Sequence, residues 1–161
     1  MLRFPRLIFL GLAAAGLGAF FGGVLLGNLM HLAACPLCIL QRMLYLLVGV
    51  LGLLGVALAH KPLPSRIVAA LTAATAVTGA GIAVYQTWLQ HHPEGPSCTA
   101  DTPWWEDLVY WAGQQAPDFF LSSGMCSDPG FMLFGLTIAN YSVVLFGALA
   151  LAALAVVLRR R

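Results

Sequence analysis

Four cysteines are the residues of this 161-residue chain whose types and spacing point most directly to chemistry. Cys35 and Cys38 form a Cys-x-x-Cys pair, whereas Cys98 and Cys126 stand singly further along the chain. Pro36 favours a helix start between the first two, where unpaired N–H groups and the positive end of the helix dipole stabilise a thiolate. The thiolate is the reactive form of cysteine, so the sequence predicts thiol–disulfide exchange between one redox pair and a second pair in a loop.

Arg42 is the one charged residue placed to assist this chemistry. It follows Cys38 by four residues, so the two side chains share a helix face one turn apart. A cation there stabilises a thiolate or another anion formed beside it. An arginine near a helix end can instead simply reach the membrane interface. We favour a functional role because Arg42 is an ionisable residue at the edge of an apolar segment.

Other uses of the cysteines fit the spacing less well. A zinc site built from four cysteines usually contains two Cys-x-x-Cys pairs, and Cys98 and Cys126 are far apart in the chain. A c-type haem needs a histidine directly after the pair, and Ile39 stands there. We therefore expect no metal site. Inert structural disulfides remain an alternative.

The elements that must position these residues follow from the composition. The chain is 60% hydrophobic and 9% charged, against roughly 25% charged residues in soluble domains. Four uncharged runs suit helices, which need about 20 residues to cross a bilayer, and they lack the alternation of barrel strands. We predict an all-α integral membrane protein, a four-helix transmembrane bundle in which residues 1–161 form one membrane domain. The expected spans are about 7–30, 37–59, 67–89 and 132–158, with a long extracytoplasmic loop at about 90–131.

The charges predict the orientation of this bundle. Apart from Arg42, lysine and arginine occur in the N-terminal tail, after the second span and at the C-terminus, so these segments are expected to be cytoplasmic. All six acidic residues fall in the long loop, and all four cysteines map to the same extracytoplasmic side, where disulfides persist. A cleaved signal peptide is disfavoured because the first apolar run, of about 24 residues, exceeds a signal core. A net charge of only +2 argues against nucleic acid as a partner.

Two further patterns concern packing. Thr102 as N-cap and Pro103 at the first helical position predict a short amphipathic helix in the long loop, ended by Pro117. Its tryptophan-rich side suits either the membrane interface or the surface of the bundle. In the first span, Gly18-x-x-x-Gly22 and Gly23-x-x-x-Gly27 permit close helix contacts.

Thiol–disulfide exchange also requires an electron acceptor. The sequence contains no nucleotide-binding or haem-attachment motif, and the redox pair opens towards lipid. A lipid-soluble carrier such as a quinone suits this location, because Arg42 would stabilise the negative oxygen of its reduced form.

The motif Cys35-Pro36-Leu37-Cys38-Ile39-Leu40-Gln41-Arg42 resembles the Cys-x-x-Cys-x-x-x-Arg signature of the DsbB family, the quinone-linked disulfide-forming proteins of bacterial inner membranes. Trp88-Leu89-Gln90 is similar to the outer end of the family's third helix, and Ser123-Gly124-Met125-Cys126 to its Gly-x-Cys element. The resemblance extends over essentially the whole chain.

The resemblance implies a role for each cysteine. Cys98 and Cys126 would form the disulfide that oxidises a periplasmic DsbA-like thiol oxidase, with Cys98 receiving the mixed disulfide. Electrons would pass to Cys35 and Cys38 through an interloop disulfide between Cys35 and Cys126. Cys38 would be the thiolate next to a membrane quinone, ubiquinone or menaquinone, with Arg42 beside it.

The chain departs from the family at one position. Some members have a quinone-contacting histidine near the outer end of the third helix, where Gln86 stands here. His91 and His92 follow that helix. They would either take the place of the family's histidine or be solvated loop residues, and we favour the second interpretation.

Two alternatives remain. An enzyme similar to vitamin K epoxide reductase also uses Cys-x-x-Cys, a second pair and quinone, but its Cys-x-x-Cys usually follows the loop pair. A non-enzymatic membrane scaffold stapled by disulfides would leave Arg42 without a purpose.

Overall fold

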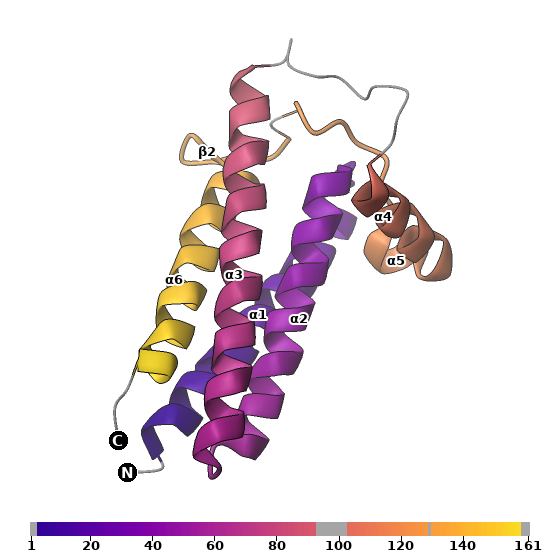
Figure 1. The fold of residues 1–161 in the computed structure, drawn as a ribbon. Helices are drawn as coiled ribbons and strands as arrows, with labels where there is room; N and C mark the ends of the chain where they lie inside the picture. Colours follow the sequence, from indigo (N-terminus) through magenta and orange to yellow (C-terminus); the bar gives the residue numbers. More distant parts are fainter. Residues whose placement is uncertain (1–2, 93–102, 129, 159–161) are drawn as a thin grey trace.

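The computed structural model describes residues 3–92, 103–128 and 130–158, with side chains from Pro5 onwards. Its elements are the helices α1 (Arg3–Leu29), α2 (Pro36–Leu58), α3 (Pro62–His91), α4 (Trp104–Gln115) and α5 (Pro117–Phe120), the strands β1 (Met132–Leu133) and β2 (Leu136–Thr137), and the helix α6 (Ile138–Leu158). Within the described residues, α1, α2, α3 and α6 are long and apolar enough to cross a membrane. The predicted four-helix bundle is confirmed (Figure 1).

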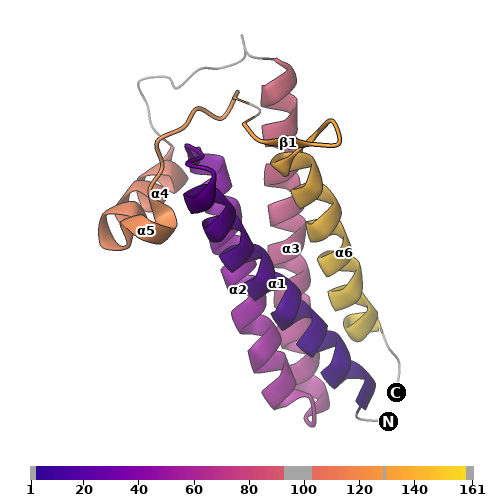
Figure 2. The same ribbon diagram turned by 180° about the vertical axis from the view of Figure 1, so that it is seen from behind.

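The four long helices pack in an open order. α1 packs along α2, α2 along α3, and α3 along α6, whereas α1 and α6 contact each other much less. Figures 1 and 2 show that α1 and α6 lie close at the end where the chain begins and diverge towards the end that carries the β-hairpin. The backbones of these two helices are therefore furthest apart at the hairpin end.

Glycines bring α1 and α2 into backbone contact. A Cβ added at Gly52 would lie 2.6 Å from the Ala13 nitrogen, and one at Gly16 would lie 2.7 Å from the Gly49 nitrogen. Gly18 and Gly22 have no other group within 4 Å of such a Cβ. This pair therefore makes no close helix contact within the described bundle, where α1 approaches α2 at Gly16 instead.

Two predicted spans have different ends in the structure. α3 runs from Pro62 to His91 rather than over 67–89. The prediction followed the uncharged run alone, whereas the helix begins before that run and carries the exposed Arg66 in its early turns. α6 begins at Ile138 rather than at 132, because residues 132–137 form a hairpin, in which Met132 pairs with Thr137. Phe134 and Gly135 take positive φ angles of 51° and 78° in its turn.

A short helix, α4, occupies the part of the long loop where an amphipathic helix is predicted, and Pro103 is its N-cap rather than its first helical residue. Thr102 lies outside the described residues. Val109 and Ala112 are buried, whereas Trp104 and Trp111 are exposed. Glu106 is also buried. The helix thus packs on the bundle with one face and presents tryptophans on another.

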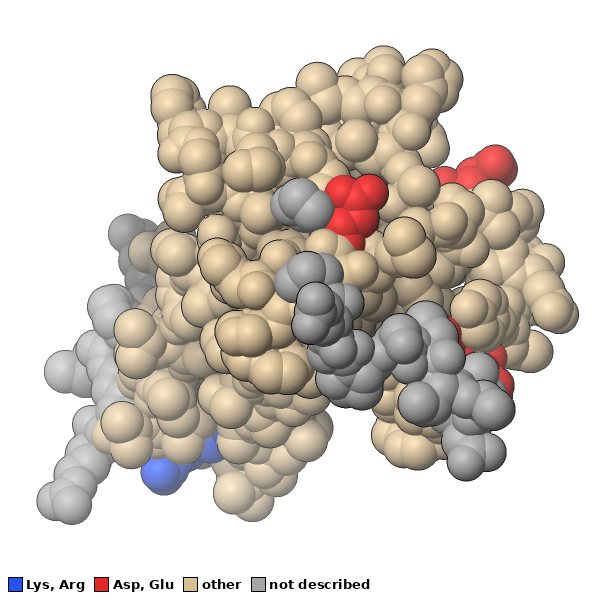
Figure 3. Space-filling view, turned by 90° about the horizontal axis from the view of Figure 1, so that it is seen from above, with Lys and Arg blue, Asp and Glu red and all other residues tan. Residues whose placement is uncertain are grey.

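Acidic side chains gather at one end of the bundle. Figure 3 looks down on the end that carries the hairpin and α4, where several acidic groups are visible and basic groups show only at one edge. Among the basic residues that the structure describes, Lys61 and Arg66 lie where α3 begins, at the opposite end. The bundle therefore has two ends of different charge.

Candidate redox site

Cys35 and Cys38 stand at the start of α2. Cys35 is the N-cap, with φ −82° and ψ 162°, and Pro36 opens the helix as predicted. The Cys38 backbone N–H points at the Cys35 Sγ at 3.4 Å, and the two sulfurs lie 3.0 Å apart. A disulfide needs about 2.05 Å, so an approach of about 1 Å would join these thiols.

Cys126 reaches the same place from the loop before α6. The backbone N–H groups of Ser123 and Gly124 donate to the Ala34 carbonyl at 2.9 and 3.0 Å. Gly124 lies so close to the Ala33 carbonyl that a side chain at this position would collide with it. The clamped turn sets Cys126 in hydrogen-bond contact with Cys35.

Cys35 is therefore the central sulfur of three. A hydrogen bond with Cys35 lowers the pKa of Cys126 below its ordinary value. The pKa of Cys35 is raised because its thiol hydrogen-bonds to Cys126 and Cys38 and is buried. The proton is thus favoured on the middle sulfur and the thiolate on Cys126. Cys98, the fourth predicted site cysteine, lies outside the described residues.

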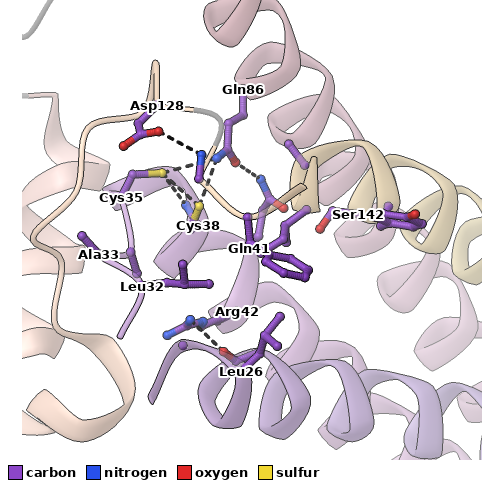
Figure 4. A pocket seen from close by; sticks show the side chains of 18 of the residues that line it. Leu26, Leu32, Ala33, Cys35, Cys38, Gln41, Arg42, Gln86, Asp128 and Ser142 are labelled. Atoms are coloured by element: carbon purple, nitrogen blue, oxygen red, sulfur yellow. Dashed lines mark hydrogen bonds between the residues drawn. The ribbon is translucent and has the colours of Figure 1, made fainter. Parts of the chain in front are cut away.

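Two buried amides support the redox pair (Figure 4). Gln86 Nε2 on α3 lies 3.0 Å from the Cys38 Sγ and 3.4 Å from the Cys35 Sγ. Gln41 Nε2 donates to Gln86 Oε1 at 2.6 Å. Because the carbonyl of Gln86 is occupied by this bond, its N–H groups face the sulfurs, where they stabilise a thiolate.

The sequence offered three side chains at the outer end of the third helix, Gln86, His91 and His92, as possible contacts of a quinone. Of these three, Gln86 is the one that reaches the cysteines. His91 and His92 are exposed, with their Nδ1 atoms beside the helix carbonyls of Thr87 and Trp88. Gln41 is a site residue that the sequence analysis did not single out. Its spacing of three residues from Cys38, on the same helix face, was the available signal.

Arg42 lies against α1. Its Nη2 donates to the Gly23 carbonyl at 2.9 Å, and its Nη1 lies 3.5 Å from the Phe119 carbonyl. Gly23 and Gly27 leave room for the guanidinium, since a Cβ at Gly27 would be 2.9 Å from Nη2. Within the described part of the chain, no carboxylate forms an ion pair with Arg42. Its positive charge is therefore available to an anion beside it.

The redox pair, the two buried amides and Arg42 line one wall of a cavity of about 480 Å³. Its other walls are largely apolar and come from α1, α6 and the hairpin, for example Leu26, Leu145 and Leu136. The volume lies within the range of about 300–1,000 Å³ common for small-molecule sites. A cavity with largely apolar walls that also presents two thiols, Arg42 and Asp128 suits a mainly apolar small molecule with a few polar groups.

Comparison with known proteins gives a consistent result. The family model described as disulfide bond formation protein DsbB matches residues 5–156. Two similar relatives are each named disulfide bond formation protein B. The one from Dechloromonas aromatica is 41% identical over 153 residues, covering 94% of this chain and 90% of the relative. The one from Azoarcus sp. is 36% identical over 164 residues, covering 99% and 96%.

Proposed function

The chain belongs to the DsbB family of disulfide bond formation proteins, and from this premise we propose that it reoxidises a periplasmic DsbA-like thiol oxidase and passes the electrons to a membrane quinone. It would be a quinone-dependent oxidoreductase of the bacterial inner membrane, with its cysteines on the periplasmic side and both termini in the cytoplasm. The observation that carries the proposal is the contact of Cys35 with both Cys38 and Cys126 at the edge of the cavity that Arg42 lines.

The first half of the reaction is disulfide exchange. A thiolate of the reduced partner attacks Cys98 in the Cys98–Cys126 disulfide and releases the Cys126 thiolate. That thiolate attacks Cys35 in the Cys35–Cys38 disulfide, which forms the interloop Cys35–Cys126 bond and releases the Cys38 thiolate. The contact between Cys126 and Cys35 places the attacking sulfur beside its target and supports this order.

The second half restores the Cys98–Cys126 disulfide. The partner's second thiolate resolves its mixed disulfide and releases Cys98, which attacks Cys126 and releases Cys35. The partner leaves with a disulfide, and Cys35 and Cys38 hold two electrons and two protons.

A bound quinone would accept these two electrons and two protons and leave as the quinol, while Cys35 and Cys38 rejoin. The cavity wall formed by Cys38, Gln41 and Arg42 would hold its ring. Gln86 keeps the Cys38 sulfur in place and stabilises its thiolate through the N–H groups that face it. Arg42 stabilises negative charge on the thiolate or on a nearby oxygen. The apolar part of the cavity, lined by residues of α1 and α6 such as Leu26 and Leu145, would take an apolar tail.

The purified protein in detergent tests the proposal, with a reduced DsbA-like oxidase as electron donor and quinone absorbance as the readout. We expect turnover that is lost in Cys38→Ser, while that variant still captures the partner as a mixed disulfide. Full turnover by Cys38→Ser would show that the transfer order is wrong. Absence of turnover in the unmodified protein, with all cysteines stably oxidised, would favour the disulfide-stapled scaffold.

A further inference from the structure

Tyr45 on α2 has a buried hydroxyl that the redox chemistry described so far does not use. The residue is only 5% exposed, and among the described buried side-chain atoms its hydroxyl oxygen stands without a hydrogen-bond partner. Ser142 on α6 is close enough to act on this hydroxyl as a weak partner, but the pair does not reach the distance and angle of a regular hydrogen bond. A buried polar group without a partner costs free energy, so such a group calls for an explanation in terms of what it binds.

Tyr45 lines the same cavity as the cysteines. It follows Cys38 by seven residues, so it lies on the same helix face, about 10 Å further along the axis. Its ring stacks on Phe146 at a centroid distance of 4.0 Å and an angle of 4°. This stacking fixes the direction of the hydroxyl. Figure 4 shows Ser142 across the cavity from Cys35 and Cys38, so Tyr45 and Ser142 supply polar groups away from the thiols.

We propose that the Tyr45 hydroxyl donates a hydrogen bond to the quinone carbonyl oxygen that lies remote from Cys38. This inference rests on the proposed function. A quinone ring carries two carbonyl oxygens on opposite sides, and two-electron reduction makes both more negative. The thiols and Arg42 gather around one side of the cavity, and an oxygen on the other side needs a donor of its own. A phenol hydroxyl without an internal partner meets that need.

The matching variant is Tyr45→Phe, which keeps the stacked ring and removes only the hydroxyl. The control is Tyr85→Phe on α3, since Tyr85 is 45% exposed and lies outside the cavity lining. With ubiquinone-1 and with menadione, we expect Tyr45→Phe to raise the KM for quinone about 3- to 10-fold, the size of one hydrogen bond. The rise in melting temperature caused by either quinone should shrink in parallel, and Tyr85→Phe should match the unmodified protein.

Three results would overturn the inference. Unchanged KM and unchanged quinone-induced stabilisation in Tyr45→Phe would show that the hydroxyl does not bind the ring. A loss confined to ubiquinone-1 would assign the bond to a methoxy oxygen, which menadione lacks. A lower melting temperature of quinone-free Tyr45→Phe would reveal an internal partner, since removing an unpartnered hydroxyl should leave stability unchanged or raised. Failure of the unmodified protein to reduce or be stabilised by either quinone would instead refute the proposed function itself.

Discussion

Replacing Gly27 by alanine tests whether the position of the Arg42 guanidinium controls quinone reduction. The new Cβ would lie 2.9 Å from Nη2, whereas ordinary contact begins at 3.4 Å. Because the contacted atom is the end of a flexible side chain, the guanidinium should yield by about 0.5–1 Å while the backbone stays in place. Alanine also favours a helix over glycine by about 1 kcal/mol, so α1 should not lose stability.

The size of the effect follows from Coulomb's law. Two unit charges 4 Å apart interact by about 4 kcal/mol at an effective dielectric constant of about 20. An increase of 0.5–1 Å in their separation removes about 0.5–0.8 kcal/mol, which corresponds to roughly a 2- to 4-fold lower rate. Removal of the charge in Arg42→Met would be far more severe, by up to about a thousandfold.

The assay compares kcat/KM for quinone with the rate of mixed-disulfide formation with the partner. Gly18→Ala is the matched control, since it lies on the same helix with no other group within 4 Å of the added carbon. We expect Gly27→Ala to slow quinone reduction alone. Equal activity in the two variants, or an equal loss of quinone and partner rates in Gly27→Ala, would refute the role given to the guanidinium.

Three further predictions concern the sulfurs. Gly124→Ala should lift the turn that holds Cys126, and mass spectrometry should find the Cys35–Cys126 disulfide reduced about tenfold, the worth of one to two hydrogen bonds; an unchanged yield would contradict the clamp. Gln86→Leu should slow alkylation of Cys38 at pH 7 about tenfold by removing the donor that faces it, and an unchanged rate would make the amide merely structural. Cys35→Ala removes the hydrogen bond that lowers the pKa of Cys126, so its alkylation midpoint should move to higher pH; a fixed or lower midpoint would disprove that cause.

The sequence predicted the four long helices and the part of the site that lies on α2, because these depend on local patterns. Four uncharged runs predicted four helices, and Pro36 predicted the helix start that places Cys35 at its N-cap. The spacing of Cys38 and Arg42 predicted a shared face, and both line the cavity. Helix periodicity alone sufficed for these inferences.

Contacts between distant segments were not predictable in this way. Gln41 and Gln86 are 45 residues apart. In a sequence, neutral amides in apolar helices look the same as amides that only form hydrogen bonds between helices. Gly23 and Gly27 matched a helix-packing pattern, whereas the structure uses them to admit a side chain. The hairpin before α6 was hidden because Met132 and its neighbours are apolar like the helix that follows.

The arrangement of the three sulfurs has a consequence for how fast electrons move within the protein. The Cys35 sulfur would need to approach that of Cys38 by only about 1 Å to form a disulfide, and the turn that holds Cys126 is clamped by two backbone hydrogen bonds. A rotation of the Cys35 side chain between its two neighbours would therefore suffice to move the bond, and the backbone could stay in place. The rate of this internal exchange then depends mainly on which sulfur holds the proton, because the attacking sulfur must be a thiolate. Internal exchange should accordingly follow pH closely and depend little on solvent viscosity, and a rate that fell in proportion to added glycerol would instead point to loop motion as the slow step.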